Sequence, residues 1–390
     1  MEVDVEPSAS AVDAARAIAP LAAECAERSE QERSLAPELV SALENAGLLR
    51  LCVPRSLGGG EVPPEELVGV VEELGRADGS TAWCVAVAAT SGALAAYLPE
   101  ADAQAVYGAA SGCVGGVFAP KGRALAVDGG YRVTGRWPFT TGVDHSDWLM
   151  GGCLVEDDGD IRVLDGGIPD IRLMLFPATA VEVIDTWSVS GLQGTGSHDI
   201  QVADLAVPSG HSASLFGDSP REPGPLYAFP IFGLLALAIS GVALGIARGA
   251  IEDLLELAVG KLPTLQTKPL AAQSDTQIRV AKAEANLRAA RALVGEAIGE
   301  AWRDVEGGGE VSLESRAALR MAANHAMVSS AGVVDEMYSL GGGTSIYSTS
   351  PLQRRFRDVH TATQHVLVGP PVWQTAGRVL LGQQVRPQQL

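Results

Sequence analysis

The sequence predicts an α+β protein with a helical part, a β-rich part and a second helical part, in that order. Three observations predict this. Apolar residues recur at spacings of three and four up to about residue 112, alternate with polar residues from about 113 to 220, and return to helical spacing after about 225. We therefore expect domains at residues 1–112, 113–220 and 221–390. Strands and helices do not alternate one by one, so a doubly wound nucleotide-binding fold is disfavoured.

Local patterns justify each part. In the first, "AVDAARAIAPLAAECAER" and "PEELVGVVEELGRADG" have helical spacing, and the glycine closing the second is typical of a helix end. In the second, "RALAVDGGYRVTGRWPF" alternates around a Gly-Gly turn, which predicts a β-hairpin, and "SHDIQVADLAVP" is one of the short strand-like segments that follow. In the third, "SDTQIRVAKAEANLRAARALVGEAIGEAWRDVE" predicts one long helix.

One apolar stretch tests whether the chain crosses a membrane. Residues 229–247, "FPIFGLLALAISGVALGIA", carry no charge, and their length alone would allow a membrane span. However, the stretch contains Pro230 and three glycines, and it continues into the amphipathic "RGAIEDLLELA". We therefore predict a helix buried on all sides within a bundle.

Composition limits the partners and the compartment. With 47% hydrophobic residues the chain can bury a large interior, and its net charge of −19 disfavours nucleic acid and anionic membranes as partners. The five cysteines form no CxxC pair, and the acidic start "MEVDVEPSAS" lacks the features of an export signal. We expect reduced, mostly buried thiols in a cytoplasmic protein.

Common catalytic and binding motifs are missing from the sequence. His360 and His365 are five residues apart, so on one helix they diverge by roughly 140° and cannot both bind one metal ion. No Gly-rich loop is followed by the Lys-Ser/Thr of a P-loop, and no G-x-S-x-G elbow occurs. The sequence "GTGS" at 194–197 is interpreted as a turn. No metal site is predicted.

Four stretches in order resemble the acyl-CoA dehydrogenase superfamily over essentially the whole chain. They are "GGYRVTGRWPFTTGVDHSDW" at 129–148, "GLQGTGSHDIQVADLAVP" at 191–208, "LGGGTSIYSTSPLQRRFRDVHTATQH" at 340–365, and "AGRVLLG" near the C-terminus. The resemblance is closest to the flavin-dependent monooxygenases that act as oxygenase components of two-component hydroxylases. It implies an N-terminal helical domain, a middle β-barrel or sandwich, and a C-terminal four-helix bundle.

The resemblance also implies which residues contact flavin. The strand matching "WPFTTG" lies against the ring in the family, with Phe139 packed on the ring and Thr141 beside flavin N5. A flat tricyclic ring suits an aromatic face, and N5 needs a hydrogen-bonding group that is cheap to bury. From the residues alone, Phe139 could equally be strand core and Thr141 a half-buried β-former. The implied contacts are Phe118, Ala119, Phe139, Thr140, Thr141, Gly142, Gly341 and Gly342.

The absence of a catalytic glutamate indicates which branch of the superfamily the chain resembles. Acyl-CoA dehydrogenases remove a substrate proton with a glutamate supplied from one of two places, which here fall on Val366 and near Leu235. No Asp or Glu occurs between Glu222 and Glu252, nor after Asp358. The stretch "GKLPTLQTKPLAAQ" also lacks the Arg-x-x-Phe-Gly with which family dehydrogenases grip the FAD of a neighbouring subunit. This suits an enzyme that takes reduced flavin as a diffusible substrate, FAD or FMN.

His365 is the predicted catalytic residue together with Thr141. In the oxygenase branch the matching histidine lies by the C4a–N5 edge of flavin, where oxygen adds to give a C4a-hydroperoxide. A histidine titrating near neutrality could handle that proton or deprotonate a phenol or amine. The alternative is a core histidine near a helix end. Apolar neighbours would keep the pocket dry and contact substrate; those expected are Trp83, Val366, Val368 and Trp373.

The remaining histidines receive weaker assignments. His360 is expected beside the residues that touch flavin or near the flavin tail, and His145 and His198 are expected to be structural.

We therefore predict a flavin-dependent monooxygenase that oxygenates a small aromatic or an amine with reduced flavin from a separate reductase. The family implies a homotetramer. Two alternatives remain: an acyl-CoA or carrier-thioester dehydrogenase whose base lies elsewhere, and a flavin-fold protein used as a non-redox scaffold, binding subunit or cyclase. Flavin binding in each redox state would separate the three.

Overall fold

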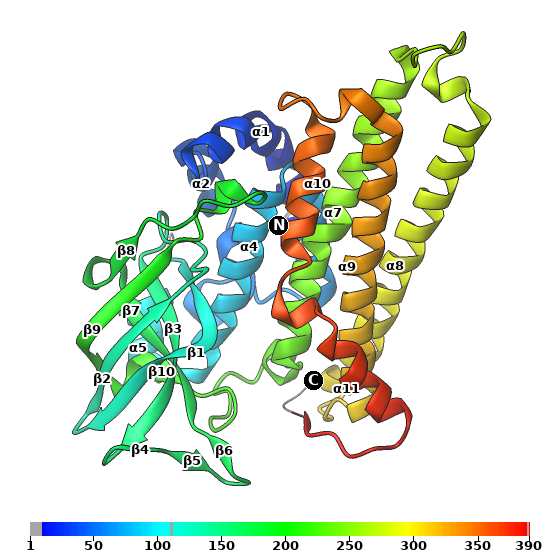
Figure 1. The fold of residues 1–390 in the computed structure, drawn as a ribbon. Coiled ribbons are helices and arrows are strands. Elements are labelled where there is room, and N and C mark those ends of the chain that lie inside the picture. Colours follow the sequence, from blue (N-terminus) through cyan, green and yellow to red (C-terminus); the bar gives the residue numbers. More distant parts are fainter. Residues whose placement is uncertain (1–9, 110–111, 388–389) are drawn as a thin grey trace, which may run out of the picture.

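The protein is built from two groups of helices and a curved β-sheet, in the predicted order along the chain (Figure 1). The computed structural model describes residues 10–109, 112–387 and 390. The predicted α+β fold class, with helices before and after a middle β-domain, is confirmed. Predicted boundary 112 falls between the last N-terminal helix and the first strand, and boundary 220 falls between the last strand and the next helix.

Short polar side chains set the starts of two N-terminal helices, α1 and α4. Ser10 accepts a hydrogen bond from the Asp13 backbone N–H, and Asp78 accepts one from Thr81 N–H, as N-cap residues do. Gly79 therefore starts a helix rather than ending the one before it, contrary to the prediction. The helices are α1 (Ala11–Glu32), α2 (Pro37–Asn45), α3 (Pro64–Ala77), α4 (Gly79–Gly92) and α5 (Glu100–Tyr107), with 3₁₀ turns η1 (Leu48–Arg50), η2 (Arg55–Leu57) and η3 (Ala93–Tyr97).

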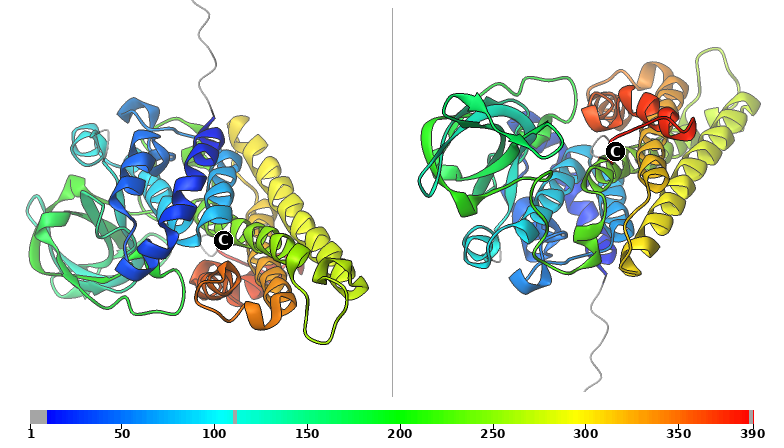
Figure 2. Two further views of the ribbon diagram at one scale, coloured as in Figure 1. Left: turned by 90° about the horizontal axis from the view of Figure 1, so that it is seen from above. Right: turned by 90° about the horizontal axis from the view of Figure 1, so that it is seen from below.

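The β-domain contains a strongly curved sheet with the strand order β10-β7-β3-β1-β2-β9-β8 (Figure 2), in which β4 also pairs with β3. Strands β5 and β6 form a separate two-stranded sheet. The predicted hairpin is present as β1 and β2, which pair antiparallel up to Val127 and Gly130. Strands β1 and β3 pair in parallel. The strands are β1 (Val114–Val127), β2 (Gly130–Trp137), β3 (Trp148–Asp157), β4 (Asp160–Ile161), β5 (Val163–Leu164), β6 (Ile168–Pro169), β7 (Ile171–Pro177), β8 (Glu182–Ile184), β9 (Asp199–Pro208) and β10 (Ser212–Ala213), with 3₁₀ turns η4 (Ala178–Ala180), η5 (Gln193–Thr195) and η6 (Ser209–His211).

Strand β2 ends at Trp137, so most of the "WPFTTG" stretch is a loop rather than the strand that was expected. Trp137 is fully buried and donates its ring N–H to Gly152 O at 2.7 Å. The chain then leaves the sheet and returns at Thr141, which forms an isolated bridge with Gly116. Residues 138–142 are therefore a segment held at both ends by the sheet.

The C-terminal part is a bundle in which α7, α9 and α10 lie side by side and α8 packs on the outside (Figure 1). The long helix predicted at 274–306 is confirmed as α8. The elements are α6 (Pro225–Ala228), α7 (Ile231–Gly260), α8 (Ser274–Glu306), α9 (Leu313–Gly341), α10 (Pro351–Ala362) and α11 (Pro371–Leu380), with 3₁₀ turns η7 (Leu270–Ala272), η8 (Gly342–Thr344) and η9 (Val366–Val368).

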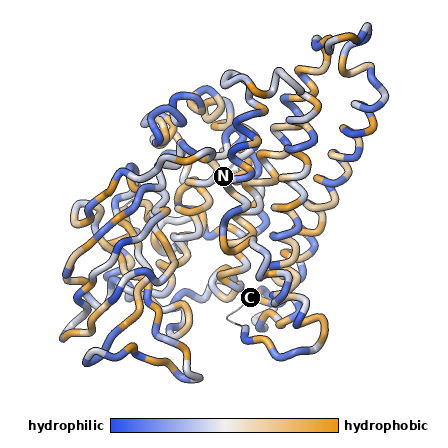
Figure 3. The backbone as a smooth tube through the Cα atoms, viewed as in Figure 1, coloured by the Kyte–Doolittle hydropathy of each residue, from blue (hydrophilic) through white to orange (hydrophobic). Residues whose placement is uncertain are grey.

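Helix α7 contains the uncharged stretch and forms the centre of the bundle. Hydrophobic residues follow one another along it (Figure 3). Two helical segments, Gly79–Tyr97 and Ile231–Gly260, are long and apolar enough to cross a membrane, but 89% and 83% of their most apolar windows are buried inside the protein. Such burial is characteristic of core helices, as predicted for α7.

The two helical parts share one hydrophobic core. A single cluster of buried residues runs from α1 through α3 and α4 to α7, α9 and α10. The sheet has its own core around Trp137 and Phe176, and a smaller cluster joins one face of the sheet to η3 and α5. The N-terminal helices and the bundle thus form one packed body, on which the sheet is seated.

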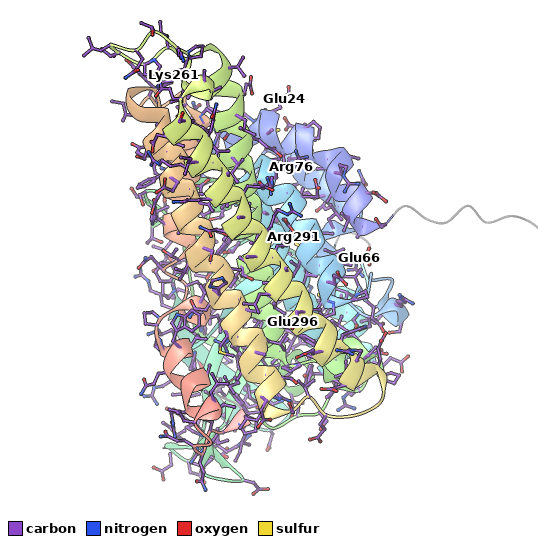
Figure 4. The ribbon with its side chains drawn as sticks, turned by 90° about the vertical axis from the view of Figure 1, so that its right-hand side faces the viewer. Glu24, Glu66, Arg76, Lys261, Arg291 and Glu296 are labelled. Atoms are coloured by element: carbon purple, nitrogen blue, oxygen red, sulfur yellow. The ribbon has the colours of Figure 1, made fainter. Side chains whose placement is uncertain are left out.

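Glycines bring α3 and α7 into close contact within that body. A Cβ on Gly245 would lie 2.3 Å from Glu72 O, and one on Gly75 would lie 2.8 Å from Val242 O, so the two backbones nearly touch. An ion pair on the outer face, between Arg291 of α8 and Glu72 of α3 at 2.8 Å, ties the third helix to this pair (Figure 4).

The cysteines are all buried and unpaired, as expected. Burial raises the pKa of every one of these thiols, to about 12 for Cys52 and to about 11 for Cys113. The thiols are therefore protonated at neutral pH.

The close approach of α3 and α7 generates a stability prediction. The substitution Gly245→Ala should lower the free energy of unfolding by about 1–3 kcal/mol. The added methyl group meets backbone atoms of α3, which can move away only if the helix moves with them. Chemical denaturation followed by circular dichroism measures it. Gly295→Ala on α8 is the control: no atom lies within 4 Å of its added Cβ, so we expect a gain of up to about 1 kcal/mol. Equal effects of the two substitutions would contradict this packing.

Candidate active site

His365 lies at the end of α10 and faces α4. It is the N-cap of η9, and its Nδ1 accepts a hydrogen bond from the Leu367 backbone N–H at 3.3 Å. Its ring meets the Trp83 ring edge to face, with centroids 5.7 Å apart and planes at 70°. An imidazole whose Nδ1 accepts a hydrogen bond carries its hydrogen on Nε2 when neutral, so Nε2 is left as a donor.

Two polar residues of α9 hold the turn that carries His365. Arg320 donates from Nη2 to Leu367 O at 3.0 Å, and Asn324 donates from Nδ2 to Gly369 O at 3.1 Å. Both side chains are buried. The Arg320 Nε has no hydrogen-bond partner among the described residues. These two α9 side chains thus fix the main chain of η9 and of the residue after it, by donating to backbone carbonyl oxygens.

Burial lowers the pKa of His365 to about 4, and the positive charge of Arg320 lowers it further in the same direction. The expectation that His365 titrates near neutrality is therefore wrong. The imidazole is neutral at physiological pH because the pocket removes water and places a cation nearby. Among the described residues, Arg320 is the charged group that perturbs His365, and no carboxylate does so.

Phe139 projects from the 138–142 loop with a strained backbone. Its φ is +65°, a region that bulky residues avoid, and its side chain is 67% exposed although Trp137 two residues earlier is fully buried. Its ring meets the edge of Trp187 at 6.2 Å. Strain that exposes an aromatic ring costs stability, and such outliers cluster at ligand sites.

Thr141 ends a chain of buried hydroxyl groups. Its Oγ1 lies 2.8 Å from Ser197 Oγ, which in turn lies 2.8 Å from Thr195 Oγ1. Thr195 donates to Leu192 O, also at 2.8 Å. Thr140 is fixed beside this chain, because its backbone N–H donates to His198 O at 3.0 Å. The "GTGS" turn at 194–197 is present, and it places two of these hydroxyls.

Asp358 of α10 anchors the same loop. Its Oδ1 accepts from the Leu192 backbone N–H at 2.6 Å, and Gly191 lies so close to α10 that an added Cβ would be 2.2 Å from Arg357 O. Leu192 has φ +53°, which this hydrogen bond helps to hold. Burial raises the pKa of Asp358 to about 7, and the nearby Asp78 carboxylate adds to the shift.

Helix α4 brings the two halves of the site together. It contacts both α10 and η5. Trp83 faces His365, and the next residue, Cys84, has its Sγ 3.9 Å from Thr195 O. The hydroxyl chain of the β-domain and the imidazole of the bundle therefore lie against the same turn of one N-terminal helix.

Several predicted contacts lie elsewhere. Gly341 and Gly342 lie where α9 ends, next to Lys261, whose Nζ donates to Gly341 O (Figure 4). The 12-residue α10 separates this loop from His365, a rise of about 18 Å. Trp373 lies on α11 in a groove of about 390 Å³ that it shares with α8 and α9, and His365 is not among the residues lining this groove.

The remaining predicted contact residues differ in their exposure and backbone conformation. Val366 is 77% exposed, whereas Val368 is buried. Phe118 is half-buried and Ala119 is exposed at an irregularity in the pairing of β1 with β3. Gly142 has φ +90° at the turn after Thr141.

The histidines outside the site are bonded locally. His360 Nε2 lies 2.8 Å from Asp335 on α9, away from the site. His198 Nδ1 accepts from the backbone N–H groups of Thr186 and Trp187. The part of the chain that the structure describes contains no group of three or more His, Cys, Asp or Glu that could hold a metal ion.

Sequence reasoning missed Arg320, Asp358 and the pair Thr195 and Ser197. A single arginine within the otherwise apolar stretch "AALRMAA" at 317–323 was the available signal for Arg320. The sequence "GTGS" indicates a turn, and nothing in it indicates that its two hydroxyl groups are linked to Thr141. Asp358 was used to mark the last acid of the chain, but its burial depends on contacts across 166 residues.

Comparisons with known proteins agree with this geometry. Models of the acyl-CoA dehydrogenase N-terminal and C-terminal domains match residues 10–105 and 237–370. The chain is 33% identical over 360 residues to the indole-3-acetate monooxygenase of Pseudomonas putida, which covers 92% of this chain and 90% of that protein. It is 27% identical over 365 residues to HsaA of Rhodococcus jostii (strain RHA1), the oxygenase subunit of a flavin-dependent monooxygenase, which covers 91% of this chain and 93% of that one.

A solved structure is similarly close. XiaF from Streptomyces sp., in complex with FADH2 and glycerol, superposes with a TM-score of 0.88 at 26% identity, over 96% of this chain and 95% of that chain.

The order of helices, curved sheet and helices, together with the matches to both domain models, defines a protein of acyl-CoA dehydrogenase fold. The chain belongs to the acyl-CoA dehydrogenase family, in its branch of flavin-dependent monooxygenases.

The Asp358 anchor generates the first site prediction. The folded protein keeps this carboxyl protonated up to about pH 7, whereas the unfolded chain ionises it near 3.8, so its contribution to stability is lost as pH rises between these values. Asp358→Asn keeps an acceptor for Leu192 N–H and removes the charge. We expect it to be more stable than the native protein at pH 8, by up to about 4 kcal/mol, with the difference shrinking toward pH 4.

Urea denaturation at several pH values measures this difference. Asp358→Ala is the matched variant, because it leaves the buried Leu192 N–H without an acceptor and should be less stable than Asp358→Asn throughout. A native protein more stable than Asp358→Asn at pH 8 would show that the carboxylate is ionised and paired.

The neutral state of His365 generates the second site prediction. The unfolded chain binds a proton at this residue below about pH 6.5 and the folded protein only below about 4, so stability falls as pH drops through this window. His365→Asn retains an N-cap acceptor for η9. We expect its stability to fall less between pH 7 and pH 4, by up to about 3 kcal/mol, as measured by denaturant titration. Parallel curves for the two proteins would rule out a depressed pKa.

Proposed function

We propose that this flavin-dependent monooxygenase is the oxygenase component of a two-component system that takes reduced flavin from a separate reductase and oxygenates a small aromatic or an amine. The observation that carries the proposal is a neutral histidine facing a tryptophan, with no carboxylate acting on it. The name of a relative as an oxygenase subunit supports the reductase. We place the enzyme in the cytoplasm.

The residues present fit a flat tricyclic ring. The exposed, strained Phe139 offers an aromatic face, and Thr141 beside it offers an oxygen with unused lone pairs. When bound, reduced flavin supplies the two electrons that activate oxygen. Phe139 packs on the ring, Thr140 and Gly142 hold the loop, Thr141 hydrogen-bonds at N5, and Phe118 and Ala119 lie toward the pyrimidine side.

His365 acts as a hydrogen-bond donor in this proposal. Its Nδ1 is occupied by the Leu367 N–H and its pKa is near 4, so at neutral pH it does not take up a proton at either nitrogen. Its Nε2–H instead orients an oxygen atom of the reacting partners. Trp83 and Val368 exclude water around it, which limits wasteful loss of hydrogen peroxide. Val366, exposed at the rim, contacts the substrate.

The proposed substrate is a small aromatic with an apolar face. Trp83 provides an aromatic wall at its half-buried position, and a relative named indole-3-acetate monooxygenase makes indole compounds the first candidates. Trp373 lines the separate groove between α8, α9 and α11, and we do not include it in the proposed contacts of His365.

The glycine loop supports a proposed homotetramer. Gly341 and Gly342 lie beyond the far end of α10 from His365, about 18 Å away, so they cannot touch the ring that His365 faces. In an assembly of several copies they approach the flavin of a neighbouring subunit, where the glycine backbone allows close contact.

The dehydrogenase alternative lacks its base. The two places from which the family supplies glutamate hold Leu235, buried in α7, and Val366, exposed after His365. The buried carboxyl of Asp358 is engaged with Leu192. We infer that no thioester substrate is deprotonated at this site.

Isotope incorporation tests the proposal. Protein mixed with chemically reduced FAD or FMN, ¹⁸O2 and indole-3-acetate or a panel of phenols and amines should form a product carrying one ¹⁸O atom, detected by mass spectrometry. His365→Asn should reduce the yield by about 10²-fold or more and release more hydrogen peroxide. His360→Asn is the control, because His360 pairs with Asp335 outside the site, and it should retain activity. Reduction of bound oxidised flavin by an acyl-CoA would support a dehydrogenase instead.

A further inference from the structure

We propose that Thr195 and Ser197 set the direction of the buried hydroxyl chain and so fix Thr141 as a hydrogen-bond acceptor, which favours reduced over oxidised flavin at this contact. The inference rests on the proposed function, because it assigns a selection rule to the same site. Its positioning residues are Thr195 and Ser197, which act on the flavin only through Thr141.

The direction of the chain follows from its fixed end. The Thr195 Oγ1 lies 2.8 Å from Leu192 O, and two oxygen atoms this close must share a hydrogen. A carbonyl has none, so Thr195 donates. Each hydroxyl has a single hydrogen. With that of Thr195 committed to the carbonyl, the contact with Ser197 requires Ser197 to donate.

The same reasoning reaches the flavin contact. Because Ser197 has given its hydrogen to Thr195, the 2.8 Å contact between Ser197 and Thr141 requires Thr141 to donate to Ser197. Thr141 is then left with lone pairs and no hydrogen to offer a ligand. All three side chains are buried, so water does not compete for these hydrogens.

The Leu192 carbonyl, at which the hydroxyl chain ends, is itself held by further hydrogen bonds. Leu192 O also accepts from the Trp187 ring N–H and from the Thr195 backbone N–H, each at 3.2 Å. The backbone of Leu192 is anchored by its N–H to Asp358 at 2.6 Å. The carbonyl that orients the chain therefore cannot turn away without breaking contacts to a helix of the bundle.

Reduced and oxidised flavin differ in whether N5 carries a hydrogen, and a hydrogen-bond acceptor beside N5 distinguishes the two states. In reduced flavin N5 carries a hydrogen and donates to Thr141. In oxidised flavin N5 has a lone pair, which faces the lone pairs of Thr141 and loses its solvent hydrogen bond without replacement. Over one turnover reduced flavin, O2 and substrate become oxidised flavin, oxygenated substrate and water. The product flavin thus loses the N5 hydrogen that held it, which favours its release to the reductase.

The predicted size of the preference follows from the cost of one unsatisfied buried group. We expect this contact alone to favour reduced over oxidised flavin by about tenfold to a hundredfold. The quantity to measure is the ratio of the dissociation constants of oxidised and reduced flavin, from anaerobic fluorescence and absorbance titrations of the full-length protein. The shift in flavin reduction potential on binding gives the same ratio independently.

Thr195→Val tests the mechanism without altering Thr141. Valine has the shape of threonine but no hydroxyl, and Leu192 O keeps two other donors. Ser197 is then free to donate to Thr141, which can turn its own hydrogen toward N5. We expect oxidised flavin to bind about tenfold more tightly, with little change for reduced flavin. Thr195→Ser keeps the hydroxyl and should retain the native ratio.

A second variant, Ser197→Ala, tests the same inference in case Thr195→Val does not fold. Ser197→Ala removes the acceptor of the Thr141 hydrogen, so it should narrow the preference in the same direction, and unfolding midpoints will show which variants are intact. A ratio unchanged in both variants, or equal weakening of both redox forms, would overturn the inference. A native protein that binds both forms equally would overturn it while leaving flavin binding in place. Binding of neither form would reject the proposed function as well.

Discussion

The hydrogen bond from Leu192 N–H to Asp358 connects the two bodies of the protein at the point where chemistry is expected. One partner lies on α10, seven residues before His365, and the other lies in the β-domain loop that leads to the hydroxyl chain. Because both groups are buried, water cannot replace either. The position of Thr141 relative to His365 therefore depends on a contact that neither the bundle nor the sheet could make alone.

The electrostatics of the site are set by exclusion of water more than by opposite charges. Burial lowers the pKa of His365 to about 4 and raises that of Asp358 to about 7, so His365 is neutral at physiological pH and Asp358 is mostly protonated only below about pH 7. Arg320 adds a positive charge that its neighbours meet with carbonyl oxygens. A dry, hydrogen-bonded site in which no carboxylate acts on His365 suits oxygen transfer, in which stray protons lead to loss of peroxide.

The sequence predicted the architecture well because its patterns are local. The hairpin at 128–130, the uncharged core helix α7 and the uninterrupted α8 each followed from spacing within a single segment. Site geometry was less predictable. The low pKa of His365 comes from burial and from Arg320, which is 45 positions away, and the role of Ser197 comes from Thr141 and from a carbonyl fixed by Asp358. The positive φ of Phe139 could not be read from its neighbours.

The burial of every cysteine has a consequence for the durability of the enzyme. Any catalyst that mixes a reduced flavin with oxygen releases some hydrogen peroxide when a turnover fails, and peroxide attacks the thiolate form of cysteine. Here each sulfur is shielded from solvent and its pKa is raised, so little thiolate forms at neutral pH. These five thiols can thus tolerate the by-product of a failed turnover.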